Sequence, residues 1–529
     1  MARSWSWFTM IIVALLASFA TPEQAKAASS LKQSDCSDLN DADFSGVTDA
    51  PTQIIQIKYV PSANGLPAYC YVKGYVASNI NFELELPLEN WNGKFVEVGC
   101  GGFCGVSLDG YVEPGHDCDL LLRRGYVCIA SDLGHRSTIP DAKWAYNNKD
   151  AIFDFAIRGA HVVALSGKAI AQKLYGKTPQ RSYFWGCSTG GRQGLVAAQN
   201  FPEDFDGILA GAPALNLSAR FVAMLWNDRS MKDQSGNPLI GSTEARFIQA
   251  AAIAECDMND GVKDGLIGDP RSCRFDPKRL ACDKTKAAGC LSPSQVAAVQ
   301  KVLSGPTNAQ GTPLYAGGLS PEVNLDELNQ MRRGGQTRPQ YFSGEFFRYM
   351  GFMPAPGPAW RNDEFDFDRD VRRLGLVEAQ LASTNPDLRR FKANGGKLIV
   401  YQGWSDVPIS PFPTIDYYET VTRTMGGIKV TQDFMRLFMV PGMEHCIGGP
   451  GAVQVDYLTA LENWVEKGEA PQMLVGSHVK DETEADWIFP LDPERIKFTR
   501  PIYPYPARVR YSGHGDPAKY TSFEPESTP

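Results

Sequence analysis

The pentapeptide Gly186-Cys187-Ser188-Thr189-Gly190 constrains this chain more than any other stretch. It follows the apolar run Tyr183-Phe184-Trp185 and precedes a segment of helical character at 192–200. Gly-x-Ser-x-Gly between a strand and a helix is a nucleophile elbow, a sharp turn that exposes the serine hydroxyl. Glycines flank the serine because such a turn leaves no room for a Cβ on either side. Ser188 is therefore the predicted nucleophile.

Strand and helix patterns alternate around this elbow. Segments 82–88, 95–98, 126–131, 183–185 and 208–210 are strand candidates, and apolar residues recur with helical spacing over 151–174. The run at 126–131 is apolar throughout, as expected of a strand buried on both faces. This alternation predicts a mostly parallel sheet, and with the elbow it predicts the α/β-hydrolase fold.

The middle of the chain departs from this pattern. From about 220 to 390, strand alternation stops and Pro, Gly, Asp and Arg become frequent; sheet patterns return at 398–401 and 435–440. We therefore predict an α/β-hydrolase catalytic domain, 28–219 and 391–529, interrupted by a lid domain, 220–390. Insertions beyond the carboxyl ends of parallel strands lie where sites form. The Pro- and Tyr-rich tail from Arg500 is predicted to be irregular surface chain.

The N-terminus has the pattern of a secretory signal. Arg3 is followed by an apolar stretch at 8–20 and by the small-residue cleavage pattern Ala25-Lys26-Ala27. Residues 1–27 are therefore predicted to be removed, leaving a protein that is secreted, or periplasmic in a bacterium. A retained anchor is the alternative, although no run approaches the roughly 20 apolar residues that a membrane span needs. The net charge of −8 argues against nucleic acid as a partner.

A serine nucleophile needs a base, and the base needs a residue that orients it. In this fold the order along the chain is serine, acid, histidine. His445 follows the strand candidate 435–440, and Asp406 follows the strand candidate 398–401. The predicted triad is therefore Ser188, Asp406 and His445. The other histidines are interpreted as structural or surface residues, although His135 follows a strand end and could line the site: they are His116, His135, His161, His478 and His514.

The oxyanion of the reaction needs two backbone N–H donors. One is expected from Thr189, the residue after the nucleophile. The other is expected from Gly101 or Gly102, because the glycine-rich loop 99–103 directly follows the strand candidate 95–98.

The chain contains 12 cysteines, with no CxxC pair and no zinc-type spacing. Export makes a disulfide framework plausible. If Ser188 and His445 meet, their neighbours Cys187 and Cys446 are also brought together, at a distance compatible with a bridge. The alternative is that Cys187 is itself a nucleophile, but the elbow presents position 188.

A second motif, at 257–266, places Asp257, Asp260 and Asp264 in one short loop. Carboxylates with backbone carbonyls, here those of Val262 and Leu266, suit calcium. The loop resembles an EF-hand but has Gly268 where the twelfth-position glutamate belongs. The alternative is an exposed acidic turn. Because Cys256 and Cys273 flank the loop and it lies in the insertion, a calcium ion there would be structural.

Three motifs together resemble those of the tannase/feruloyl esterase family. They are Gly-Cys-Ser-Thr-Gly-Gly-Arg-Gln-Gly at 186–194, Gly-Trp-Ser-Asp at 403–406 and Gly-Met-Glu-His-Cys at 442–446. Further matches lie at 66–70, 91–95, 132–135 and 504–506, so the resemblance covers nearly the whole mature chain. The family includes feruloyl esterases, tannases and a hydrolase of mono(2-hydroxyethyl) terephthalate.

The resemblance implies the same triad, a lid, and calcium bound through Asp257, Asp260, Val262, Asp264 and Leu266. It also implies the disulfides Cys187–Cys446, Cys36–Cys70, Cys256–Cys273 and Cys282–Cys290. Family members often carry a cysteine where this chain has Tyr503. Four cysteines remain open to three pairings, or to a free thiol at Cys128: they are Cys100, Cys104, Cys118 and Cys128.

These features predict a secreted serine carboxylesterase that forms an acyl-enzyme and acts on small aromatic esters. Hydroxycinnamate esters are the first expectation; galloyl esters and terephthalate monoesters are the alternatives. A secreted serine peptidase and an inactive, calcium-binding hydrolase are readings of a different class. Phe346, Phe347 and Trp360 either sandwich the substrate ring or form the lid core. Arg348 or another lid arginine could bind the carboxylate of a dicarboxylic acid.

Overall fold

The computed structural model describes residues 1, 31–106, 118–283, 289–330, 335–481 and 489–526. Apart from Met1, the predicted signal peptide 1–27 lies outside these residues, as does His116. Within these ranges, no helix is both long and apolar enough to span a bilayer.

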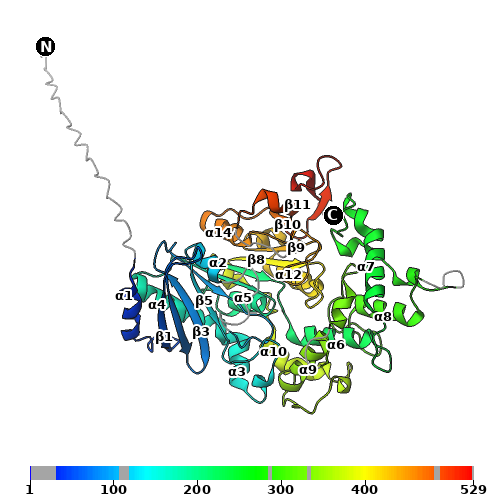
Figure 1. Cartoon of the computed structure of the whole chain (residues 1–529), viewed down its shortest axis with the longest axis horizontal. Coiled ribbons are helices and arrows are strands. Elements are labelled where there is room, and N and C mark those ends of the chain that lie inside the picture. Colours follow the sequence, from blue (N-terminus) through cyan, green and yellow to red (C-terminus); the bar gives the residue numbers. More distant parts are fainter. Residues whose placement is uncertain (2–30, 107–117, 284–288, 331–334, 482–488, 527–529) are drawn as a thin grey trace.

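A nine-stranded mixed sheet forms the centre of the molecule, in the order β1-β2-β3-β5-β4-β6-β7-β8-β9 (Figure 1). The first three strands are antiparallel, and β5, β4, β6, β7, β8 and β9 run parallel. Their bounds are β1 (Thr52–Val60), β2 (Tyr69–Val76), β3 (Ile80–Pro87), β4 (Lys94–Val98), β5 (Val127–Ser131), β6 (Arg181–Cys187), β7 (Gly207–Gly211), β8 (Lys397–Gly403) and β9 (Met435–Val440). The predicted α/β-hydrolase fold is confirmed.

Helices cover both faces of this sheet. Apolar residues of α4, α5 and α12 share one core with the sheet, and those of α2 and α14 share another on the opposite face. The helices are α1 (Gln33–Ser37), α2 (Cys118–Arg123), α3 (Lys149–Phe153), α4 (Gly159–Tyr175), α5 (Thr189–Asn200), α6 (Leu217–Ser230), α7 (Ser242–Cys256), α8 (Pro293–Ser304), α9 (Arg338–Tyr349), α10 (Gly375–Leu381), α11 (Arg389–Ala393), α12 (Pro411–Met425), α13 (Ile428–Gln432) and α14 (Tyr457–Lys467).

The prediction of one continuous helix over 151–174 is wrong in one respect. A π-helical turn, η3 (Asp154–Arg158), separates α3 from α4. The buried guanidinium of Arg192, from α5, donates to the carbonyl oxygens of Phe155 and Ala156, both at 2.8 Å. A side chain that inserts into the carbonyl ladder of a helix displaces its regular hydrogen bonds. Arg192 of α5 thus shapes the turn between α3 and α4.

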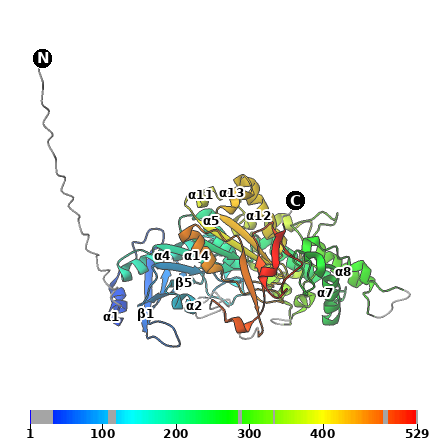
Figure 2. The ribbon, with the colours of Figure 1, turned by 90° about the horizontal axis from the view of Figure 1, so that it is seen from above.

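The chain between β7 and β8, called the insertion below, contains α6 to α11 and several 3₁₀ turns. Among its described residues, no strand joins a named sheet. In two perpendicular views, α7 and α8 lie at the end of the molecule opposite α1 and β1 (Figure 1 and Figure 2).

The C-terminal tail is not irregular, contrary to the prediction. Strand β11 (Ile496–Ile502) pairs with β10 (Leu474–Val479), and β12 (Arg508–Tyr511) pairs with β13 (Phe523–Glu526). The rings of Phe498 and His478 stack across the first pair, at a centroid distance of 4.8 Å. The prolines obscured this pattern in the sequence, because they interrupt runs that otherwise favour strands.

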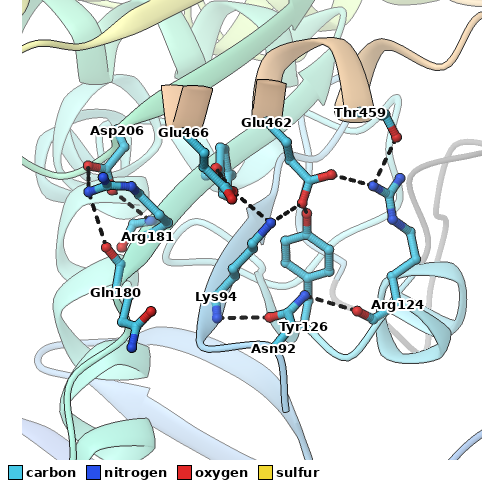
Figure 3. A network of polar contacts seen from close by, with 12 residues as sticks. Asn92, Lys94, Arg124, Tyr126, Gln180, Arg181, Asp206, Thr459, Glu462 and Glu466 are labelled. Carbon is cyan, nitrogen blue, oxygen red and sulfur yellow. Dashed lines mark hydrogen bonds and ion pairs between the residues drawn. The ribbon is translucent and has the colours of Figure 1, made fainter. Parts of the chain in front are cut away.

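A polar network fixes α14 against the starts of β4, β5 and β6 (Figure 3). Lys94 pairs with Glu462 at 2.5 Å and with Glu466 at 2.6 Å. Arg124 and the hydroxyl of Tyr126 also contact Glu462. The network lies at the amino-terminal edge of the parallel strands, so it supports the sheet from the edge opposite the elbow.

Candidate active site

Ser188 lies in the sharp turn between β6 and α5. Its backbone has φ 61° and ψ −120°, a conformation that costs energy for a residue with a side chain. A Cβ on Gly186 would lie 2.6 Å from the carbonyl carbon of Gly190, and one on Gly190 would lie 3.1 Å from that of Gly99. These contacts explain both glycines of the motif, and the turn has the geometry of a nucleophile elbow.

His445 and Asp406 follow the ends of β9 and β8 and meet directly. The distance between His445 Nδ1 and Asp406 Oδ2 is 2.8 Å. Asp406 is fully buried, and its carboxylate also accepts hydrogen bonds from the Ile409 N–H at 2.8 Å and the Gln402 amide at 3.0 Å. Because a carboxylate only accepts, Nδ1 carries the proton and Nε2 is the basic nitrogen of the ring.

Ser188 and His445 line the same cavity, which has a volume of about 580 Å³. Gly101 and Gly102 form part of its wall. The remaining lining residues come from the insertion and from loops of the sheet domain: Ile139, Pro140, Arg220, Asn324, Glu327, Gln330, Arg338, Phe342, Glu444 and Ile447. A cavity of this size and lining suits a small-molecule ligand.

The glycine-rich loop after β4 lies beside the elbow. The Thr189 hydroxyl donates to the carbonyl oxygen of Gly102 at 2.7 Å. Within the described ranges, no acceptor engages the backbone N–H groups of Gly101, Gly102 or Thr189. Thr189 also begins α5, where the helix dipole favours negative charge. The loop and the helix start therefore offer donors to an anionic oxygen bound near Ser188.

Among the described residues, two arginines line the cavity, Arg220 and Arg338, and neither is the arginine named from the sequence. Arg348 instead donates to the Trp360 carbonyl oxygen at 2.8 Å, outside the cavity lining. Desolvation by burial, together with the charge of Arg338, lowers the pKa of Arg220 to about 9. Its buried Nη1 has no hydrogen-bond partner among the described residues. No sequence pattern distinguishes Arg220 and Arg338 among the 52 lysines and arginines.

The aromatic residues named from the sequence belong to the core of the insertion. Phe346, Phe347 and Trp360 are buried together in one apolar cluster, and none lines the cavity. Only Phe342 of this cluster reaches the cavity wall. Of the two roles expected from the sequence, contact with the substrate ring or formation of the lid core, these three residues therefore have the second.

His135 does not line the cavity. Its ring stacks on Trp144 at 3.6 Å, and its Nε2 lies 2.8 Å from the Phe103 carbonyl oxygen. Burial lowers its pKa to about 4, which keeps the ring neutral. His135 thus supports the glycine-rich loop from behind.

All 12 cysteines are paired, and no free cysteine remains among the described residues. The six disulfides are Cys36–Cys70, Cys100–Cys104, Cys118–Cys128, Cys187–Cys446, Cys256–Cys273 and Cys282–Cys290. Cys187–Cys446 joins the neighbours of Ser188 and His445 across 259 residues. On the chain-entropy model such a closure contributes on the order of 5 kcal/mol. The four cysteines with open pairing form two short-range bridges, so Cys128 is not a free thiol.

The acidic loop at 257–266 is tightly bonded. Asp257 accepts the N–H groups of Asp264 and Gly265 at 3.1 and 3.0 Å, and Asp264 pairs with Arg500 at 2.5 Å. Burial, with the charges of Asp264 and Asp257, raises the pKa of Asp260 to about 7. Among the described residues, no group of three or more His, Cys, Asp or Glu is arranged to hold a metal. The donor types fit calcium, but Arg500 occupies the Asp264 carboxylate.

The fold and the site define an α/β-hydrolase with a serine at its elbow and a histidine–aspartate pair beside it. A model of the tannase and feruloyl esterase family matches residues 67–525. The chain belongs to this family and is a carboxylic ester hydrolase of that type. Membership favours this class over a peptidase or an inactive calcium-binding protein.

Relatives and solved structures support the same family. The chain is 34% identical over 521 residues to the mono(2-hydroxyethyl) terephthalate hydrolase of Piscinibacter sakaiensis, covering 86% of this chain and 84% of that protein. It is 33% identical over 441 residues to a probable feruloyl esterase B-2 of Aspergillus flavus, covering 78% and 80%. The crystal structure of feruloyl esterase B from Aspergillus oryzae superposes with a TM-score of 0.80 at 27% identity, covering 93% of this chain and all of that one.

Proposed function

We propose that this chain is an exported serine carboxylesterase that cleaves esters of aromatic acids through Ser188, His445 and Asp406. One observation carries the proposal. His445 is held by a buried carboxylate at 2.8 Å and lines the same cavity as Ser188, the residue at the elbow. A base, its orienting acid and a nucleophile that lines the same cavity are the parts that acyl transfer needs.

The reaction follows from these positions. His445 Nε2 takes the proton of Ser188 Oγ as the oxygen attacks the ester carbonyl, while Asp406 stabilises the imidazolium. The N–H groups of Thr189 and of Gly101 or Gly102 bind the oxyanion. Collapse expels the alcohol, which receives the proton from His445, and leaves an acyl group on Ser188. Water, activated by His445, then releases the aromatic acid and restores the serine.

Hydroxycinnamate esters are the proposed substrates. The support is that relatives bear the name feruloyl esterase. One of them is a solved structure whose whole length is matched by this chain. Phe342, which is buried except for a small exposed part, lines the cavity that contains Ser188 and could contact a phenyl ring there.

A second candidate is favoured by the arginines. A buried guanidinium nitrogen without a partner is costly unless a ligand supplies one. Arg220 has such a nitrogen, and Arg338 lies in the same wall. Together they suit the free carboxylate of an aromatic dicarboxylic acid monoester, the type of substrate named in one relative.

Rates on methyl ferulate, methyl gallate and mono(2-hydroxyethyl) terephthalate decide between these candidates. We expect methyl ferulate to have the highest kcat/KM, by about tenfold or more, since a differing polar contact changes binding by roughly 1–3 kcal/mol. The second candidate predicts that the terephthalate monoester is best and that Arg338→Gln abolishes this advantage. Arg348→Gln, outside the cavity, is the matched control. Hydrolysis of none of the three esters would contradict both candidates.

Calcium is proposed as a structural ion of the acidic loop, held by Asp257, Asp260 and Asp264 with the carbonyls of Val262 and Leu266. The support is the number of carboxylates in ten residues and the raised pKa of Asp260, which reflects burial first and the nearby charges of Asp264 and Asp257 second. A divalent cation there would compensate this charge and compete with Arg500 for Asp264.

Thermal melting tests the ion. Calcium at about 100 times its Kd stabilises a protein by about 2.7 kcal/mol, so chelation is expected to lower Tm by several degrees. Asp260→Asn should remove this calcium dependence. Asp233→Asn, in an exposed turn of the same insertion, should keep it. A Tm that is unchanged by chelator and by added calcium would rule out the ion.

Export is supported by the six disulfides, which persist in oxidising compartments. We expect the N-terminal sequence of the protein recovered outside the cytoplasm to begin at Ala28, after removal of residues 1–27. Recovery of the intact N-terminus would instead favour an anchor.

A further inference from the structure

A five-residue loop closed by the Cys100–Cys104 disulfide carries both glycines of the proposed oxyanion hole. The two cysteines are four positions apart, and their Cα atoms are separated by 5.7 Å. Gly101 and Gly102, between them, line the cavity that contains Ser188. The bridge therefore encloses the donor groups themselves, rather than joining distant elements.

The backbone of this loop is in a conformation that needs support. Gly102 has φ 58° and Cys104 has φ 49°, both in the left-handed region. Cys104 is not a glycine, so this conformation is unfavourable for it. The Cys104 N–H donates to the Gly101 carbonyl oxygen at 3.0 Å, which closes a tight turn. A free chain would leave such a turn readily.

The other polar groups of the loop are bonded away from the cavity. The Gly102 carbonyl oxygen accepts the Thr189 hydroxyl at 2.7 Å, and that of Phe103 lies 2.8 Å from His135 Nε2. The Phe103 N–H donates to the Ile139 carbonyl oxygen at 2.8 Å. The N–H groups of Gly101 and Gly102, like that of Cys100, have no acceptor among the described residues, and the two glycines line the cavity.

The disulfide also contacts the elbow helix. The Gln193 side-chain amide of α5 lies 3.3 Å from the Cys100 carbonyl oxygen and 3.4 Å from Cys100 Sγ. Cys104, at the end of the loop, is fully buried. The bridge is thus held against the helix that begins immediately after Ser188, so it relates the position of the glycine donors to that of the nucleophile.

We propose that the Cys100–Cys104 disulfide is a positioning device for the oxyanion hole, holding the N–H groups of Gly101 and Gly102 where the tetrahedral oxygen develops. The inference rests on the proposed catalytic role of Ser188. Preorganised donors stabilise the transition state more than the bound ester, because the full negative charge forms only on attack. Loss of the bridge should therefore affect kcat and leave substrate binding nearly unchanged.

The test compares Cys100→Ser/Cys104→Ser with Cys118→Ser/Cys128→Ser. The second pair is the matched control, since Cys118–Cys128 is also short-range and joins α2 to β5 without lining the cavity. Removing one oxyanion donor lowers kcat about 100- to 1,000-fold in other hydrolases, so a loosened loop is expected to cost about 10- to 100-fold. We expect KM on methyl ferulate to change less than about threefold, and kcat of the control to stay within about threefold.

A boronic acid inhibitor separates positioning from general loosening. Its tetrahedral adduct on Ser188 places an oxygen in the oxyanion hole, so its Ki should rise with the fall in kcat. The Ki of ferulic acid, which places no such oxygen, should stay constant. Unchanged kcat in Cys100→Ser/Cys104→Ser, or an equal loss in the control pair, would overturn the proposal. Neither result affects the triad, which Ser188→Ala tests separately.

Thr189→Val keeps the proposal testable if the cysteine variant does not fold. It retains the Thr189 N–H but removes the hydroxyl that holds the Gly102 carbonyl. We expect kcat of Thr189→Val to fall with KM little changed, because the Gly102 carbonyl is released. Where the cysteine variant folds, the combined variant should lose less than the product of the separate losses, because both changes release the same loop. Unchanged kcat in Thr189→Val, or fully multiplicative losses, would count against a shared positioning role.

Discussion

The Ser188→Ala variant is expected to hydrolyse methyl ferulate about a millionfold more slowly than the parent protein, as loss of a serine nucleophile does in other hydrolases. Without Oγ no acyl-enzyme forms, and only binding and the oxyanion donors remain. The backbone at this position stays in its strained turn, and only one buried atom is lost. Initial rates on methyl ferulate, together with thermal melting, measure the effect.

Ser166→Ala is the control for this change. Ser166 is also a fully buried serine, but it lies in α4 and does not line the cavity. We expect its kcat to stay within about threefold of the parent value. Hydrolysis by Ser188→Ala at an unaltered rate, with an unaltered Tm, would contradict the proposed mechanism.

Asp406→Asn is expected to lower kcat about 10,000-fold, the size of the effect when the orienting aspartate of a triad becomes an amide. The amide nitrogen cannot accept from His445 Nδ1, so the ring is no longer fixed in the tautomer that leaves Nε2 basic. The Gln402 amide and the Ile409 N–H also donate to Asp406. The new amide NH₂ group of the Asp406→Asn side chain would then face at least one of these donors or His445 Nδ1–H. Steady-state kinetics on the same ester measure the loss.

The chain contains a matched control for this pair. His161 Nδ1 lies 2.7 Å from Asp204 Oδ2, and this second histidine–aspartate contact is outside the cavity lining. Asp204→Asn should change Tm but leave kcat within about threefold. If Asp406→Asn and Asp204→Asn had the same kcat, Asp406 would not be the orienting acid.

The sheet and the placement of the candidate triad could be predicted because their signals are local. A strand buried on both faces needs a mostly apolar run, and 126–131 and 435–440 supply one, although Arg436 interrupts the second. The elbow needs glycines where a Cβ would strike backbone, as at Gly186. Because parallel strands end at one edge, residues that directly follow them are brought together whatever their separation in sequence.

The features that could not be predicted depend on contacts between distant segments. The π turn at Asp154–Arg158 is shaped by Arg192, which follows the elbow by only a few residues but acts on another helix. Arg220 and Arg338 lie on α6 and α9, and the packing of these two helices brings them to one cavity wall. Four cysteines allow three pairings, and only the approach of Cys100 to Cys104 across a tight turn selects one.

The acidic loop at 257–266 also has one feature that local sequence predicts and one that depends on a distant residue. Its composition indicates a cation, since it concentrates carboxylates and turn-forming glycines. The sequence does not reveal Arg500, which comes from the tail and reaches Asp264 at 2.5 Å. Arg500 lies more than 200 residues from the loop and changes its local charge. The composition of the loop alone therefore does not determine whether it binds a cation.

The central claim is that the ester's acyl group passes through Ser188, and mass spectrometry tests it most directly. The protein would be mixed with p-nitrophenyl ferulate, quenched in acid within milliseconds to seconds, digested and mapped. We predict a feruloyl group on the peptide that contains Ser188, with a burst of about one p-nitrophenol per protein. A feruloyl group on any other residue, or turnover by Ser188→Ala at the parent rate, would contradict the account.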